Sequence, residues 1–405
     1  MSADLHDEDV IVIGAGPCGL AIARQLAHER GIDALVVDGA DAPASAWRLR
    51  PDGFRLNTCG FWSHLPGQRI PRRHGRWPGR DAMVAYFDDY VRRQGVRLRL
   101  GVTVVRLDGH DDRWLVTTED GHAHARAVIV ATGNYHTPAL PPWPGMDGFT
   151  REIVHSADYR NPWPYAGRDV LVVGSGNSAT DIAVQLSDGV AARVRLSVRT
   201  PPHLVPRATA GLPIDAAGPA FGRLPLAVLD RAHAVLQRSW FGDLGVHGLP
   251  APDTGLYSAL RRDGHVPTIG DELVTRIKDG RIGIVRAVES FDAGDIVLED
   301  ESRITADAVI AATGYHHGLE PLVGHLGLLG EDGHPAVNAA PSAAPGLWFA
   351  GYDEPLIGPL RSFRRRAGPI AAEVARHLAG ISGAEPVCAG RDPRRRMRRG
   401  RRTTP

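Results

Sequence analysis

The stretch VIVIGAGPCG, residues 10–19, decides how this chain folds. A short run of β-branched residues ends in a Gly-x-Gly-x-x-Gly pattern, and the apolar residues of 20–27 then recur at helical spacing. A second apolar run ends at Asp38 and has the length of a buried parallel strand. Strand, glycine loop, helix and strand in this order predict a βαβ unit that binds a dinucleotide.

Each glycine of this loop has its own task. Gly14 permits the tight turn from strand to helix, Gly16 lets the backbone approach a pyrophosphate, and Gly19 lets the helix pack closely on the strand. Asp38 lies 24 residues after Gly14, where a carboxylate accepts hydrogen bonds from ribose hydroxyls. Cys18 is interpreted as a small residue that fills the turn, because no neighbouring cysteine offers it a redox partner.

A second fingerprint, VLVVGSGNSA at residues 170–179, begins 160 residues further along the chain. Gly174 and Gly176 take the turn and close-approach positions, and alanine takes the third. The next predicted strand is followed by Arg199 rather than by an acidic residue. A guanidinium binds a ribose 2′-phosphate that a carboxylate would repel, so Arg199 favours NADP over NAD.

Two polar residues open the predicted helix of this second unit. Asn177 and Ser178 are expected to cap its N-terminus, with contact to the NADP phosphate as a secondary role. One fingerprint is common in α/β proteins, but two in one chain indicate two nucleotides held face to face. That arrangement predicts electron transfer from one nucleotide to the other.

The remaining chain repeats the same organisation. The apolar runs of 127–133 and 307–314 both end in Ala-Thr-Gly, and each follows its own βαβ unit. Residues 347–351 and a helix after Gly358 can complete the first unit. The prediction is an α/β protein with two Rossmann-like dinucleotide-binding domains, the second inserted in a discontinuous first domain. The proline-dense stretch 138–144 is interpreted as a crossing between them.

The expected domain boundaries follow from this repeat. Residues 1–150 form the first part of the first domain, 151–305 form the second domain, and 306–385 close the first. Within the second domain, 201–267 is a variable insertion without a recognisable motif. Residues 386–405 are a basic tail that is expected to be disordered.

Composition narrows the function classes. The chain is 43% hydrophobic and 23% charged, with a net charge of +1, which is typical of a soluble globular protein without bias toward nucleic acid. No apolar run is long enough to span a bilayer, and the first nine residues lack the charge pattern of a signal peptide. Three cysteines without a C-x-x-C pair predict no disulfide framework and favour the cytoplasm.

Together these features resemble the class B flavoprotein monooxygenases, especially the flavin-containing monooxygenases with their plant YUCCA-like and bacterial relatives. The likeness covers most of the chain and, besides the fingerprints, is carried by the segments 54–58, 65–67, 131–133, 149–159, 176–181 and 312–315. The family signature F-x-G-x-x-x-H-x-x-x-Y is matched at Phe149, His155 and Tyr159, whereas Arg151 replaces its glycine.

The resemblance implies an FAD domain at the first fingerprint and an NADP domain at the second, with FAD and NADPH as cofactors. It implies an NADPH- and O2-dependent reaction through a C4a-(hydro)peroxyflavin that oxygenates a small organic substrate. N- or S-oxygenation and keto-acid oxidation are the reaction types that fit. No nucleic acid or membrane partner is expected, and the formation of a homodimer is left open.

The resemblance also points to individual side chains. Asn57 falls in a segment where many relatives place an asparagine near the flavin, and a neutral amide donates a hydrogen bond without protonating an adduct. A turn-forming asparagine is the alternative. Trp47 and Arg48 lie where relatives contact flavin, although a packed aromatic ring and a surface arginine explain them equally well. His155 is expected to help link the two domains.

Other functions stay open at this point. A Baeyer–Villiger monooxygenase and an FAD-dependent pyridine-nucleotide oxidoreductase without oxygenation share the two-site pattern, although a disulfide reductase would need a cysteine pair. A protein that binds nucleotides without turnover would show a broken second fingerprint. His316 and His317 lack a third ligand at suitable spacing, so no metal site is predicted.

Overall fold

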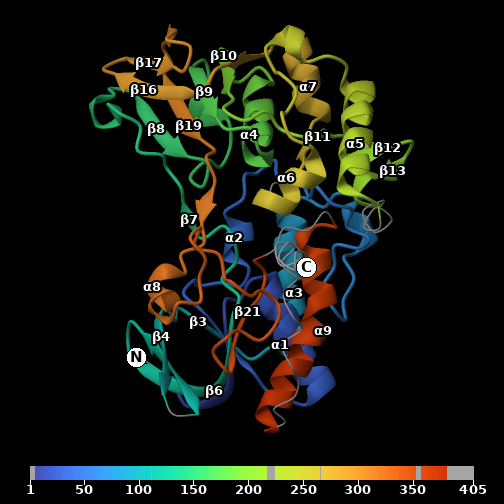
Figure 1. The fold of residues 1–405 in the computed structure, drawn as a ribbon, viewed down its shortest axis with the longest axis vertical. Coiled ribbons are helices and arrows are strands. Elements are labelled where there is room, and N and C mark those ends of the chain that lie inside the picture. The colour runs from blue at the N-terminus through green and yellow to red at the C-terminus, as the bar shows by residue number, and fades with distance from the viewer. Residues whose placement is uncertain (1–4, 111, 217–223, 265, 353–356, 381–405) are drawn as a thin grey trace, which may run out of the picture.

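The strands of the chain gather in two main sheets. The computed structural model describes residues 5–110, 112–216, 224–264, 266–352 and 357–380. One sheet lies in the lower half of Figure 1 and the other in the upper half, each accompanied by helices. The predicted α/β class is therefore confirmed.

The first sheet has the order β3-β2-β1-β6-β5-β4, with β21 beside β6. Its strands are β1 (Glu8–Ile13), β2 (Leu35–Asp38), β3 (Leu98–Leu100), β4 (Val104–His110), β5 (Arg113–Thr118), β6 (His122–Val130) and β21 (Leu347–Phe349). The pairs β1–β2, β2–β3, β1–β6 and β6–β21 are parallel, whereas β4 and β5 form an antiparallel hairpin that also pairs with β6. The expected closure of this unit by residues 347–351 is thus observed at β21.

Alternating residues of β1 face two different clusters of the core. Val10 and Val12 are fully buried against helices α1 (Pro17–Arg30), α3 (Arg80–Gln94) and α9 (Pro359–Leu378). Ile11 and Ile13 face the opposite side, where α8 (Glu320–Val323) contributes to the core. Because α9 lies alongside α1, the end of the described chain is packed onto its beginning (Figure 1).

The second sheet is parallel throughout, in the order β15-β10-β9-β19-β8. Its strands are β8 (Glu152–His155), β9 (Asp169–Val173), β10 (Arg193–Ser197), β15 (Ile282–Val285) and β19 (Ala308–Ala311). Helices α4 (Asn177–Ser187) and α7 (Asp271–Lys278) pack on each other beside it. An antiparallel layer of β16 (Val288–Asp292), β17 (Asp295–Leu298) and β18 (Arg303–Ile304) follows β15.

One expected boundary is wrong. The strand of 308–311 was assigned to the part of the chain that closes the first domain, but β19 pairs with β8 and β9 in the second sheet. Its apolar residues are fully buried there because both neighbouring strands are parallel and apolar. The second sheet therefore extends past residue 305.

Two short strands connect the halves. β7 (Thr137–Pro138) pairs antiparallel with β20 (Tyr315–His316), between the two sheets in Figure 1. The Thr313 hydroxyl donates to the carbonyl of Ala139 at 2.5 Å, and the Ala139 N–H donates to the carbonyl of Gly314 at 3.0 Å. The crossing expected at 138–144 is thus paired with a return crossing just after β19.

The stretch 201–267 contains structure that the sequence pattern did not reveal. It holds α5 (Leu226–Phe241), α6 (Leu256–Asp263) and the short strands β11 (Leu204–Val205), β12 (Ala208–Thr209) and β13 (Leu212–Pro213). β11 pairs with β14 (Thr268–Ile269). On α5 the apolar residues are not confined to one face, since Val235 is 65% exposed and Leu229 is buried. This mixing hides the helix from pattern analysis.

No helix in the described ranges is long and apolar enough to cross a membrane. The expected disordered tail, 386–405, lies outside the described residues, as does Cys388. Cys18 and Cys59 are buried, and neither forms a disulfide.

Candidate active site

The first fingerprint forms the turn between β1 and α1. Gly14 has φ +109°, and a Cβ atom there would lie 2.5 Å from the carbonyl oxygen of Ala131, just after β6. A Cβ on Gly19 would lie 2.0 Å from the carbonyl oxygen of Gly14. Packing within the protein therefore demands glycine at both positions.

Gly16 differs from these two glycines. It precedes the first turn of α1 with φ −73°, and a Cβ there would meet no protein atom within 4 Å. No side chain caps the helix, so N–H groups of its first turn are available to an anion. No packing contact of the described residues explains glycine at this position, whereas the close approach of a dinucleotide pyrophosphate would.

Asp38 lies at the end of β2 and turns its carboxylate toward this loop. One oxygen accepts the N–H of Ala15 at 2.7 Å, and the other accepts the N–H of Ala40 at 2.9 Å. Each carboxylate oxygen can accept a further hydrogen bond, so ribose hydroxyls can still bind. The ribose role of Asp38 stays a prediction.

Trp47 and Arg48 lie in the short helix α2 (Ser45–Arg48). The Trp47 ring packs edge-on against Phe54 and Phe87, with centroids 5.9 and 5.2 Å away. Arg48 forms an ion pair with Asp88 on α3 and donates to the carbonyl of Pro43. These contacts hold α2 on α3, and flavin contact by either side chain stays a prediction.

The second fingerprint repeats the geometry of the first. Gly174 has φ +134°, and a Cβ there would lie 2.4 Å from the carbonyl oxygen of Ala312, just after β19. Gly176 precedes α4 and, like Gly16, would place a Cβ more than 4 Å from any protein neighbour. Ala179 is fully buried at the third position, so its methyl group fits between helix and strand.

The capping role expected of Asn177 is wrong. No side chain caps α4, and the Asn177 amide instead donates to the carbonyl of Pro267 at 3.2 Å and accepts the N–H of Ile269 at 3.0 Å. These bonds pair the amide with β14, which lies beside the loop. Ser178 is partly buried in the same first turn. Contact of either residue with NADP stays a prediction.

Arg199 follows β10 at the carboxyl edge of the second sheet. Its side chain is exposed, and it makes no ion pair with any residue of the described ranges. Two other arginines of the same strand, Arg193 and Arg195, both pair with Asp169 at the opposite end. The guanidinium of Arg199 is thus available to an anion next to the second fingerprint.

Asn57 lies in the loop that follows α2, on the side of the second sheet. Its Oδ1 atom is buried without a hydrogen-bond partner. Other such atoms lie near the carboxyl edges of the sheets: Asn134 Oδ1 after β6, Ser156 Oγ after β8 and Thr180 Oγ1 in the first turn of α4. Because ligands of parallel sheets bind at these edges, unsatisfied polar atoms here fit a bound cofactor.

His155 has a structural environment. Its Nδ1 accepts the N–H of Ala157, so Nε2 carries the proton and donates to the carbonyl of Gly314 at 3.1 Å. Burial lowers the pKa of His155 below its ordinary value, so the ring is neutral at neutral pH. The ring packs against Tyr315 and so joins the end of β8 to the crossing strand β20. The described residues contain no cluster of metal-ligating side chains, at His316 and His317 or elsewhere.

Asp181 is a site residue to which the sequence assigned no role. It lies one turn after Asn177 on α4, and burial raises the pKa of its carboxyl group to about 6. Arg207 and Arg50 oppose this rise, whereas Glu272 adds to it. Arg207 belongs to the stretch without a recognisable motif, so only the tertiary structure brings these charges together.

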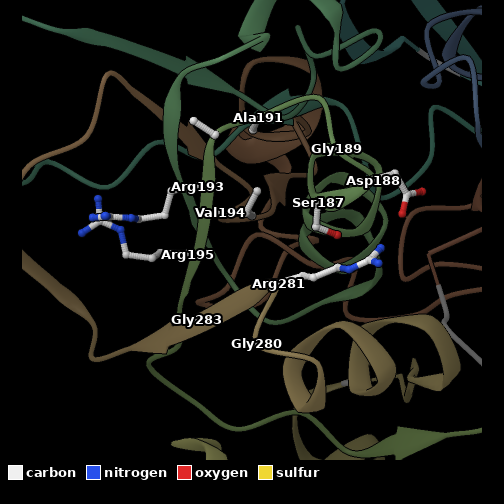
Figure 2. A pocket seen from close by; sticks show the side chains of 11 residues that line it. Ser187, Asp188, Gly189, Ala191, Arg193, Val194, Arg195, Gly280, Arg281 and Gly283 are labelled. Carbon is white, nitrogen blue, oxygen red and sulfur yellow. The ribbon is translucent and has the colours of Figure 1, made fainter.

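A hollow of about 850 Å3 lies at the other end of the second sheet. Its lining includes Ser187 and Asp188 at the end of α4 and Arg281 before β15. Figure 2 shows Arg281 extending toward these two residues, with Arg193 and Arg195 turned to the opposite side. The hollow is at the amino ends of the strands, about 15 Å along α4 from the fingerprint, and is not the dinucleotide site.

Comparisons with known proteins agree with this geometry. Residues 11–209 match the family described as pyridine nucleotide-disulphide oxidoreductase. The chain is 33% identical over 314 residues to the indole-3-pyruvate monooxygenase YUCCA1 of Oryza sativa subsp. japonica, covering 76% of this chain and 77% of the relative.

Solved structures share the fold. A flavin-containing monooxygenase from Stenotrophomonas maltophilia superposes with a TM-score of 0.68 at 24% identity, covering 91% of this chain and 99% of that chain. A cyclohexanone monooxygenase superposes with a TM-score of 0.72 at 19% identity, covering 93% and 89%.

The contrast between Gly16 and Gly14 is testable. Gly16→Ala should leave the melting temperature of the FAD-free protein within about 2 °C of the value for the unaltered protein, because the backbone conformation and the open space around residue 16 accept a methyl group. It should lower FAD affinity about tenfold or more, because the methyl group faces the pyrophosphate. Thermal unfolding and flavin titration measure the two effects. Gly14→Ala is the contrasting control and should destabilise the fold itself. Unchanged FAD affinity in Gly16→Ala would contradict this assignment.

The raised pKa of Asp181 predicts a pH-dependent stability difference. Between the ordinary value of 3.8 and about 6, the unfolded chain ionises this group while the folded protein keeps it protonated. The group therefore lowers stability progressively over this window. Asp181→Asn removes the penalty, so its gain in unfolding free energy should be near zero at pH 4 and reach ~1–3 kcal/mol above pH 6. Urea unfolding at both pH values measures it, and an equal gain at both contradicts the prediction.

Proposed function

Because the chain belongs to the class B flavoprotein monooxygenases, as an FAD-dependent enzyme that uses NADPH, we propose that it oxygenates a small organic substrate with O2 as the oxidant. One observation carries the proposal. Two glycine loops of the same geometry, at Gly14–Gly19 and Gly174–Ala179, lie at the carboxyl ends of parallel strands in the two main sheets. At the close-approach glycine of each loop, an added Cβ would meet no described protein atom within 4 Å.

The proposed domains follow the sheets. The FAD domain consists of the first sheet with α1, α3 and α9, and the NADP domain consists of the second sheet with α4 and α7. The NADP domain is inserted between β6 and β21, which are parallel neighbours in the first sheet. β7 and β20 are the two connections. This is the two-domain Rossmann arrangement that the sequence repeat predicts.

The chain's own residues bind and orient the cofactors. Gly16 and Gly176 admit the two pyrophosphates to helix N-termini, Asp38 binds ribose hydroxyls, and Arg199 binds the 2′-phosphate. When bound, FAD supplies the hydride and oxygen chemistry that no protein side chain provides. Asn57 donates a hydrogen bond from its amide at the flavin ring, where exclusion of water limits the release of peroxide.

The substrate is proposed as a small organic nucleophile or keto acid. The indole-3-pyruvate monooxygenase relative favours a keto acid, and N- or S-oxygenation uses the same cofactors. Oxygen uptake coupled to NADPH oxidation, screened over amines, sulfides and aromatic keto acids, tests the proposal. NADPH oxidation that yields only peroxide with every class would contradict it. A cytoplasmic location and a homodimer stay predictions.

Disulfide reduction is the competing function, because the matched family description includes it. The sequence has no C-x-x-C pair, and Cys18 and Cys59 are both buried outside any disulfide. A disulfide reductase needs a redox-active pair beside the flavin. The cysteines therefore favour oxygenation.

Arg199 should set the preference for NADPH. Arg199→Ala is expected to raise KM for NADPH about tenfold or more, since a charge-assisted phosphate contact is worth ~1.5–3 kcal/mol, while KM for NADH changes little. Steady-state kinetics with both nucleotides measure this. Arg193→Ala is the matched control, because it removes an exposed arginine from the opposite end of the same strand. An unchanged preference in Arg199→Ala would refute the role.

Asn57 should limit the release of peroxide. Asn57→Ala is expected to raise the peroxide formed per NADPH about fivefold while FAD stays bound, because it removes one hydrogen bond of about 1 kcal/mol at the flavin. Peroxide trapping and flavin absorbance measure the two quantities. Asn161→Ala is the control, since the amide of Asn161 makes only exposed hydrogen bonds, donating to Asp52 and accepting the N–H of Trp163. Unaltered coupling would show that Asn57 does not act at the flavin.

A further inference from the structure

Arg207 connects the second half of the molecule to the loop that carries Asn57. Its guanidinium donates to the carbonyl of Leu56 at 2.6 Å and lies 5.8 Å from the centre of the Trp77 ring. Its backbone N–H donates to Asp271 at the start of α7 at 2.6 Å. A charge-assisted bond to a backbone carbonyl is directional and stronger than a neutral one. Arg207 therefore restrains the backbone immediately before Asn57.

Asp215 restrains the same loop immediately after Asn57. Its carboxylate accepts the N–H of Cys59 at 3.0 Å and the indole N–H of Trp62. Asp215 is buried, with only 6% of its surface exposed. Both bonds fall on Oδ2, whereas Oδ1 is buried without a hydrogen-bond partner among the described residues. A buried carboxylate needs hydrogen bonds to offset its desolvation, so these two bonds tie Asp215 to the 59–62 turn. The two anchors thus bracket Asn57, one at Leu56 and one at Cys59.

The segment that carries both anchors is seated on the second fingerprint. β11 precedes Arg207 and pairs with β14. β14 is held by the Asn177 amide and by the Thr268 hydroxyl, which donates to the carbonyl of Ser175 at 3.2 Å. Ser175 and Asn177 are residues of the glycine loop itself. Hydrogen bonds therefore link this loop to β14 and β11, and the chain that follows β11 carries the two anchors of the backbone on either side of Asn57.

We propose that Arg207 and Asp215 are positioning residues that hold Asn57 in place from the second glycine loop. Their bonds to Leu56 and Cys59 act on the backbone of residues 56–59, and neither side chain is assigned a contact with the flavin or the substrate. The inference rests on the proposed role of Asn57 at the flavin. It makes the stretch 201–216 a part of the catalytic apparatus, although its sequence carries no motif.

The first measurement is structural. Amide hydrogen exchange of the FAD-bound protein should become about fivefold faster in peptides covering 56–63 when Asp215→Ala or Arg207→Ala removes one anchor, the effect of losing a hydrogen bond of about 1 kcal/mol. Arg207→Lys keeps a cationic donor and should restore most of the protection. Unchanged exchange in both Asp215→Ala and Arg207→Ala would overturn the proposal, whatever the function of Asn57.

The second measurement is a double-mutant cycle on peroxide release. Arg207→Ala should raise peroxide per NADPH about as much as Asn57→Ala, and the double variant should be no worse than Asn57→Ala alone. KM for NADPH should change less than twofold, because Arg207 does not hold the nucleotide. If Arg207→Ala raises peroxide per NADPH by the same factor in the unaltered protein and in Asn57→Ala, the positioning role is overturned. If Asn57→Ala itself leaves coupling unaltered, the proposed function of Asn57 fails, while the exchange result still decides the positioning.

Arg76→Ala is the matched control for both measurements. Arg76 also forms a hydrogen bond to the stretch 201–216, because its guanidinium donates to the carbonyl of Gly211 at 2.7 Å. Like that of Arg207, its guanidinium lies over the Trp77 ring. Its bond does not join the backbone next to Asn57. Exchange at 56–63 and peroxide release should both stay near the values of the unaltered protein. An effect equal to that of Arg207→Ala would mean that any loss of contact between the segments suffices, and would overturn the specific assignment.

Discussion

The close approach of two backbone segments underlies both halves of this protein. At each glycine loop, the turn that leaves the first strand passes a carbonyl group at the end of another strand of its sheet. Any side chain at Gly14 or Gly174 would collide with the oxygen of Ala131 or Ala312, within 2.5 Å. The left-handed φ values of both glycines also exclude other residues without strain. Because this turn sets where the following helix begins, it sets where a pyrophosphate can bind.

Buried polar groups without hydrogen-bond partners lower the folding stability near the proposed site. Buried atoms of Asn57, Asn134, Ser156 and Thr180 lack hydrogen-bond partners near the carboxyl edges of the sheets. An unsatisfied buried polar group costs ~1–3 kcal/mol, so proteins rarely keep several near one edge without a ligand to satisfy them. The charged form of Asp181 is also disfavoured here, because burial raises the pKa of its carboxyl group although two nearby arginines oppose the rise. Folding stability and the proposed cofactor binding are therefore linked at these residues.

Two kinds of connection join the halves, and they serve different ends. The strands β7 and β20 are covalent crossings, and their pairing sets where the chain enters and leaves the second sheet. The contacts of Arg207 and Asp215 are side-chain connections that reach the loop of Asn57. The first kind links the two sheets through the backbone, whereas the second reaches the position where we place the chemistry. Movement of the second sheet relative to the first would weaken both kinds of connection. The coupling of NADPH oxidation to oxygenation and the rate of amide hydrogen exchange both report on such movement.

Local signals in the sequence determined the two βαβ units, the closing strand at 347–349 and the glycine loops, because glycine turns and buried strands depend on residues close in the chain. Tertiary structure alone decided the rest. The Asn177 side chain bonds to β14 instead of capping its helix, since a neighbour from 90 residues away competes for its amide. β19 joins the second sheet because β8 and β9 bury it there. The anchors of Asn57 come from 151 and 156 residues away, and no local pattern encodes contacts of that separation.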